Sequence, residues 1–88
     1  MKYRKKPVVV EAKQFQRASD AAPIAEWCGG EVIFAETGRR VAFIAIDTPE
    51  GTMRADYGDW IIRGVQGEFY PCREDIFEAT YEEADDDR

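Results

Sequence analysis

Hydrophobic and polar residues alternate along much of the chain, a pattern that is typical of half-buried β-strands. In the first such run, residues 7–15, Val8 and Val10 share one face while Glu11 and Lys13 share the other. Strand-like runs bounded by Gly, Pro, Asp and Thr turn signals predict further strands. They are expected at residues 31–36, 40–46, 52–56, 60–65, 68–70 and 79–81. The run 40–46 is apolar on both faces, so we expect it at the centre of the sheet.

Residues 21–28 have helical periodicity instead. Ile24, Trp27 and Cys28 fall at i, i+3 and i+4, which places them on one face of a helix. Gly29-Gly30 follows, and glycine readily adopts the left-handed conformation that ends a helix. We therefore predict a short amphipathic helix in which Trp27 packs into the core rather than serving as a ligand platform.

The segment after residue 70 contains a second, shorter helical signal. Pro71 cannot donate to a ladder, so we expect it to end the strand 68–70. Residues 73–77 then form about one helical turn, with Ile76 and Phe77 in the core.

Together these elements predict an α+β fold. We expect a small antiparallel sheet of about five or six strands, with one main short helix packed on one face. The length of 88 residues indicates one domain, which we place at residues 1–82. Residues 83–88 are expected to form a disordered acidic tail.

Charge is distributed unevenly along the chain. The net charge is −6. Residues 1–17 carry six Lys or Arg and one Glu, whereas residues 74–88 carry eight Asp or Glu and one Arg. An acidic total argues against general nucleic-acid binding, which requires neutralisation of many phosphates. The basic N-terminal segment could still hold one small anion.

Several function classes lack the residues they need. The chain has no His and only one Ser, so histidine-based acid–base chemistry and serine triads are excluded. Asp56 and Asp59 could bind a cation or form an acid–base pair, but their spacing is also that of an ordinary turn. Cys28 and Cys72 are expected to be reduced thiols. We predict no catalytic residues, no metal and no cofactor, and hence no enzyme activity.

No apolar run approaches the length of a membrane span, so we expect no membrane partner. The basic N-terminus is too short and too polar for a signal peptide.

Arginines and aromatic residues are interspersed in the second half of the chain. Arginine pairs with phosphate and aromatic rings stack on bases, so such a set could hold a nucleotide. Alternatively, the aromatics form the core and the arginine stems cover it. The candidate ligand-binding residues are Lys6, Arg40, Trp60, Arg63, Tyr70 and Arg73.

Two segments, YRKKPVVVEAKQF (3–15) and GDWIIRGVQGEFYPCREDIFEATYE (58–82), resemble a family of small uncharacterised accessory proteins of tailed phages and prophages. The resemblance implies a protein in the cytoplasm of the host bacterium and assigns no catalytic residue.

Small phage accessory proteins often act by binding. We therefore expect a homo-oligomeric protein that sequesters an anionic cyclic nucleotide signal of host antiviral defence. The alternatives are an inhibitor that binds a host protein through an acidic surface and, with less support, a nucleotide-degrading enzyme.

Overall fold

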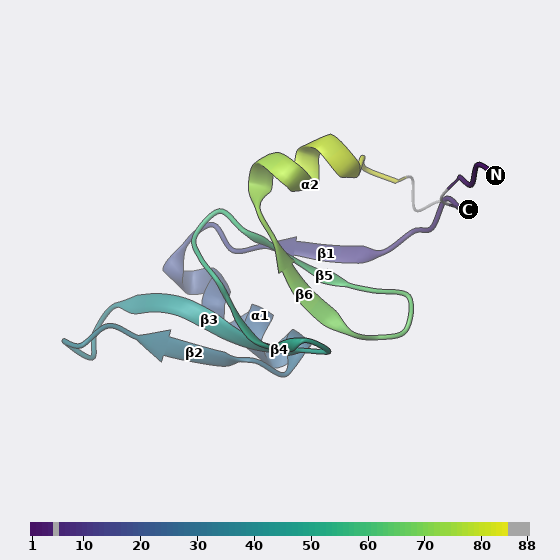
Figure 1. Ribbon diagram of the computed structural model, residues 1–88. Helices are drawn as coiled ribbons and strands as arrows, with labels where there is room; N and C mark the ends of the chain where they lie inside the picture. Colours follow the sequence, from purple (N-terminus) through teal and green to yellow (C-terminus); the bar gives the residue numbers. More distant parts are fainter. Residues whose placement is uncertain (5, 85–88) are drawn as a thin grey trace.

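A computed structural model describes residues 1–4 and 6–84 and consists of six strands, two α-helices and one 3₁₀ turn (Figure 1). In chain order the elements are β1 (Glu11–Gln14), η1 (Ala18–Asp20), α1 (Ala21–Cys28), β2 (Glu31–Phe34), β3 (Val41–Thr48), β4 (Gly51–Ala55), β5 (Trp60–Arg63), β6 (Phe69–Cys72) and α2 (Glu74–Thr80). The predicted α+β class is confirmed.

The strands form two antiparallel sheets of three strands each, where the sequence predicted one sheet. Sheet A has the order β1-β5-β6, and sheet B has the order β2-β3-β4. Sheet B is a meander of consecutive strands, but β1 pairs with β5, from Glu11 opposite Arg63 to Gln14 opposite Trp60. The hydrophobic pattern indicates which face of a strand is buried, but it does not indicate which distant strand pairs with it. For this reason the division into two sheets was not predicted.

Sheet A is covered on both faces (Figure 1). Because β5 side chains alternate between faces, Ile61 and Ile62 point in opposite directions, and both are completely buried. Ile61 packs in the core with α1 and sheet B. On the opposite face, α2 stacks its Phe77 ring on Trp60 of β5, with centroids 4.1 Å apart.

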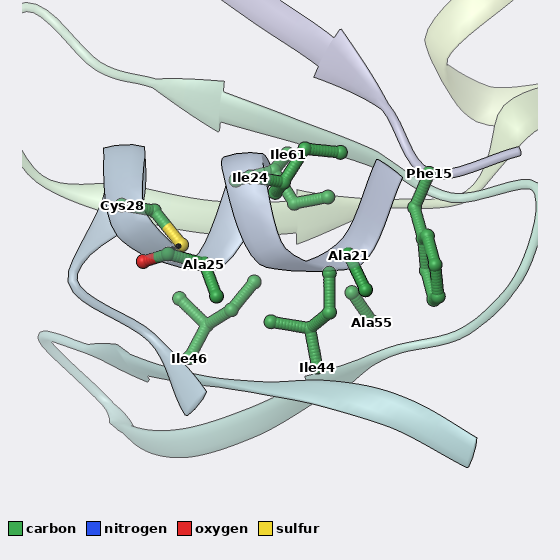
Figure 2. Packing of buried hydrophobic residues seen from close by; sticks show 9 residues of the cluster. All are labelled: Phe15, Ala21, Ile24, Ala25, Cys28, Ile44, Ile46, Ala55 and Ile61. Atoms are coloured by element: carbon green, nitrogen blue, oxygen red, sulfur yellow. Dashed lines mark hydrogen bonds between the residues drawn. The ribbon is translucent and has the colours of Figure 1, made fainter. Parts of the chain in front are cut away.

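The main core lies around α1, between the two sheets (Figure 2). Ile24 of α1 lies beside Ile61 of β5, while Ala25 and Ala21 face Ile46 and Ile44 of β3. The sheets adjoin where β6 lies against β3 and β4. Helix α1 therefore holds the two sheets together through one shared apolar cluster.

The predicted helix over residues 21–28 is confirmed with the same bounds. Gly29, with φ of 68°, supplies the left-handed residue that ends it. Gly30 allows close approach to β3, because a Cβ at this position would lie 2.6 Å from the Ala45 carbonyl oxygen. The Gly-Gly pair thus combines a helix end with a close backbone contact.

The C-terminal predictions need three corrections. Pro71 lies inside β6, because it pairs with Ile61 at the outer edge of sheet A, where no N–H is needed. The second helix extends to Thr80, so the strand predicted at 79–81 is absent. Ile76 is half exposed on this helix, since only Phe77 and Tyr81 reach the aromatic stack.

The predicted domain ends at residue 82, and the predicted acidic tail follows it. Residues 83 and 84 carry no secondary structure, and residues 85–88 of the predicted tail lie outside the described part of the chain. Among the described residues, the helices are too short and too polar to cross a bilayer.

We predict that Ile61→Ala lowers the free energy of unfolding by about 2–5 kcal/mol, because it leaves a cavity between α1 and the sheets. Val65→Ala, at an exposed turn position, is the control and should change it by less than about 0.5 kcal/mol. Urea denaturation measures both. Equal midpoints for the two variants would contradict this description of the core.

Candidate functional site

The six predicted ligand-binding residues do not form one site. Lys6 lies in the exposed segment before β1, and Arg40 lies in the exposed turn that leads into β3 of sheet B. Arg63 and the pair Trp60 and Tyr70 lie on opposite faces of sheet A, because residues of odd and even number in β5 point to opposite sides.

Trp60 and Tyr70 belong to an aromatic group beneath α2. The Trp60 ring is stacked on Phe77, which stacks in turn on Tyr81. The hydroxyls of Tyr70 and Tyr81 share a hydrogen bond of 3.5 Å. This bond, followed by burial, raises the pKa of Tyr70 to about 12. Both predicted stacking residues thus have partners within the protein, and the indole N–H of Trp60 is buried with no acceptor among the described residues.

The two predicted arginines of the C-terminal segment both form surface ion pairs. Arg73 donates to Asp75 at 2.8 Å, and this bond lowers the pKa of the Asp75 carboxyl. Arg63 pairs with Glu11 of β1 at 3.3 Å. Exposed pairs of this kind contribute about 0–1 kcal/mol, so an anionic ligand can displace either carboxylate at little cost.

Two shallow hollows on the surface do not suit an anion. One, of about 450 Å³, includes Glu31 and Asp47, and the other, of about 370 Å³, includes Glu50 and Glu68 beside Tyr70. Neither is lined by Lys or Arg. Negative potential in both hollows would repel a phosphate.

A different set of residues combines cations with aromatic rings. Lys13, Trp27, Arg63 and Phe69, which we name the cation–aromatic cluster, come from β1, α1, β5 and β6. The Lys13 Nζ lies 5.1 Å from the centroid of the Trp27 ring. Trp27 and Phe69 meet edge to face, with centroids 5.0 Å apart and planes at 74°. Arg63 lies directly opposite Phe69 in the β5–β6 ladder.

Strand register explains why the two cations of the cluster are neighbours. Lys13 pairs with Ile61, which is two residues before Arg63 on the same face of β5. Such diagonal neighbours are roughly 7–8 Å apart, within reach of long side chains that bind one group. Both cations are exposed and both rings are half-buried. The cluster can therefore offer two positive charges beside apolar ring surface, which suits a phosphate attached to a flat base.

The sequence indicated only part of this cluster. Arg63 was predicted, and Phe69 was among the interspersed aromatics, but Lys13 was assigned only to a strand face and Trp27 to the core. The one signal that could have found them is that Lys13 and Trp27 lie at the margins of two amphipathic elements. Their contact depends on how α1 docks, which no local pattern encodes.

The remaining candidate groups have structural roles. The Asp59 carboxylate accepts a hydrogen bond from the Asp56 N–H at 2.8 Å, which is the turn alternative considered for this pair. Cys28 and Cys72 are free, and burial raises the pKa of both thiols. Within residues 1–4 and 6–84, no three acidic or thiol groups are arranged to hold a metal ion.

No protein-family model, curated protein or solved structure matches the chain. The class of this protein therefore follows from its own geometry. It is a small α+β domain with a surface cluster of cations and aromatic rings.

We predict that Tyr81→Phe lowers the pKa of Tyr70 from about 12 towards the ordinary value of 10.0, because the hydroxyl that favours the neutral form is lost. The raised pKa stabilises the fold fully below pH 10, and this contribution disappears as the pH approaches 12. Absorbance of the ionised phenol gives the pKa. Tyr3→Phe, on an exposed residue, is the control. If the highest phenol pKa of Tyr81→Phe equals that of the wild type, this assignment is refuted.

Proposed function

We propose that this chain is a non-enzymatic binding protein that sequesters an anionic nucleotide at the cation–aromatic cluster. Lys13 and Arg63 bind the phosphate, and the pair of Trp27 and Phe69 offers ring surface to the base. The observation that carries the proposal is the position of the Lys13 ammonium over Trp27, with Arg63 beside Phe69.

Electrostatics support an anionic ligand at this place in an otherwise acidic protein. Lys13 takes part in none of the ion pairs found among the described residues. Within that part of the chain, Arg63 pairs with one exposed carboxylate, that of Glu11, at 3.3 Å. A phosphate that replaces this carboxylate gains charge-assisted hydrogen bonds from guanidinium and ammonium together. A nucleotide can therefore bind without breaking any buried contact.

The biological setting that we propose is a phage accessory protein in the cytoplasm of a host bacterium. In this setting the ligand is a cyclic nucleotide that signals antiviral defence, and binding lowers its free concentration. The resemblance of residues 3–15 and 58–82 to phage accessory proteins supports this setting, and the cluster supports the ligand class.

A second function is supported by the surface of α2. Glu74, Asp75 and Glu78 are exposed on this helix, and the apolar Ile76 lies exposed among them. Such a mixture suits a basic partner with a small apolar recess, as in an inhibitor of a host protein.

We predict that nucleotide co-purifies with the protein and is identified by mass spectrometry as an intact molecule. Lys13→Gln and Arg63→Gln should each weaken its binding roughly tenfold, or about 1.4 kcal/mol. Calorimetric titration with a panel of cyclic di- and trinucleotides measures this. Lys2→Gln and Arg39→Gln make the same charge changes outside the cluster and should bind normally.

Absence of binding across the panel, with no co-purified nucleotide, would refute the proposal. Equal weakening by Arg39→Gln would show that the effect is one of net charge. If the protein releases a cleaved nucleotide, the protein degrades its ligand and does not sequester it.

For the second function, we predict that the chain captures one basic host protein in stoichiometric amount. The double variant Glu74→Lys and Glu78→Lys should lose it, because the helix surface would then repel a basic partner. The double variant Glu36→Lys and Glu50→Lys, in the β2–β3 and β3–β4 turns, is the control of equal net charge. Affinity capture from host lysate compares the wild type with the two variants. If the variant with reversed charges on α2 still captures the partner, α2 is not the contact surface.

A further inference from the structure

The outer edge of β1 is an unpaired strand edge. Among the residues that the structure describes, β1 is the terminal strand of sheet A, and its ladder partner is β5. The N–H of Phe15 donates to the Asp59 carbonyl at 2.9 Å, and the Phe15 carbonyl accepts from the Gly58 N–H at 2.7 Å. Backbone groups alternate in direction along a strand, so those of Lys13 and Glu11 also point towards β5.

It follows that the backbone groups of Val10, Ala12 and Gln14 point away from the sheet. Within residues 1–4 and 6–84, no turn, loop or side-chain hydrogen bond covers their N–H or carbonyl groups. Residues 7–10 continue from β1 past the end of β5, and Val8 and Val9 are 52% and 75% exposed (Figure 1). An exposed apolar edge of this kind is a template for another strand.

We propose that this edge binds the same edge of a second copy of the chain, antiparallel and centred on Ala12. In this register each Ala12 faces Ala12 of the second copy, and Val10 faces Gln14. All three residues are those whose backbone groups point outwards, so about six hydrogen bonds form across the interface. The two sheets A become one continuous sheet of six strands.

Side-chain charge selects this register. With Ala12 at the centre, each Glu11 faces Lys13 of the second copy, which makes two opposite-charge pairs. A centre at Glu11 or at Lys13 would place like charges opposite each other. A centre at Val10 would place each charged side chain opposite Val9 or Pro7. Of these four registers, the one centred on Ala12 alone pairs Glu11 with Lys13.

In the same register Val10 lies opposite Gln14 of the second copy and Val9 opposite Phe15. The Phe15 side chain is completely buried within its own chain, so the valines add little apolar contact, and the pairing rests on backbone hydrogen bonds and charge. The pairing also brings Lys13 of the second copy opposite Glu11, which is the carboxylate beside Arg63. The inference does not depend on nucleotide binding, since it rests on the strand edge alone.

Sedimentation equilibrium of charge variants tests the register. Glu11→Lys places Lys opposite Lys, and Lys13→Glu places Glu opposite Glu, so each variant alone should dimerise at least roughly tenfold more weakly than the wild type. An equimolar mixture of the two variants has opposite charges in both pairs and should recover the dimer. Glu36→Lys and Arg39→Glu, in the β2–β3 turn, carry the same charge changes and should dimerise as the wild type does.

Amide hydrogen exchange of the wild type provides a test that needs no substitution. Protection of the Ala12 and Gln14 amides should rise with protein concentration, while the Lys13 amide, which points to β5, should be protected at every concentration. A wild type that stays monomeric would overturn the proposal, as would single variants that dimerise normally. So would a mixture that does not recover the dimer, or Ala12 exchange that is independent of concentration.

Discussion

Burial of two adjacent isoleucines on opposite faces of β5 is the constraint on which the rest of the structure depends. Ile61 and Ile62 are both inaccessible to solvent, and successive strand residues point to opposite sides. Each fully buried isoleucine contributes about 1.5–3 kcal/mol only if its own face of the sheet is covered. A three-stranded sheet in so small a chain must therefore acquire a layer on each side. Helix α1 with sheet B supplies one layer, and α2, through Phe77, supplies the other.

This layered arrangement determines which surfaces remain available for binding. The face of sheet A beneath α2 is occupied by stacked aromatic rings, so Trp60 and Tyr70 stabilise the fold. The other face is filled by the core as far as Ile61 and opens only at its margin. There Lys13 and Arg63 flank the half-buried rings of Trp27 and Phe69. Nucleotide binding is proposed at this margin because Lys13, which is in no ion pair among the described residues, and Arg63 lie there beside two half-buried rings.

Local signals in the sequence predicted the local structure well. The Gly-Gly pair and the spacing of Ile24, Trp27 and Cys28 defined α1 to the residue. Turn signals located the strands, although their ends shifted by a few residues. The division into two sheets was missed because the pairing of β1 with β5 joins residues about 50 positions apart, and alternation carries no information about partners.

The candidate site was harder to predict for the same reason. Trp60 is an aromatic residue in a strand whichever face it occupies, and only the extension of α2 to Thr80 shows that its ring is covered. Trp27 packs against the core as its spacing predicted, and its ring nevertheless stays half-buried beside Lys13. Arg63 was identified because an arginine at a strand end is exposed in nearly any packing. Sites formed by side chains from several elements require the tertiary arrangement itself.

The two indole N–H groups of the chain distinguish the proposed ligand site beside Trp27 from its alternatives. In a two-dimensional nitrogen–proton NMR titration with the co-purified nucleotide, the Trp27 indole resonance should shift together with the backbone amides of Lys13 and Arg63. The indole resonance of Trp60, which lies beneath α2, should stay fixed. A shift of the Trp60 resonance with none at Trp27, or shifts confined to α2, would contradict the account.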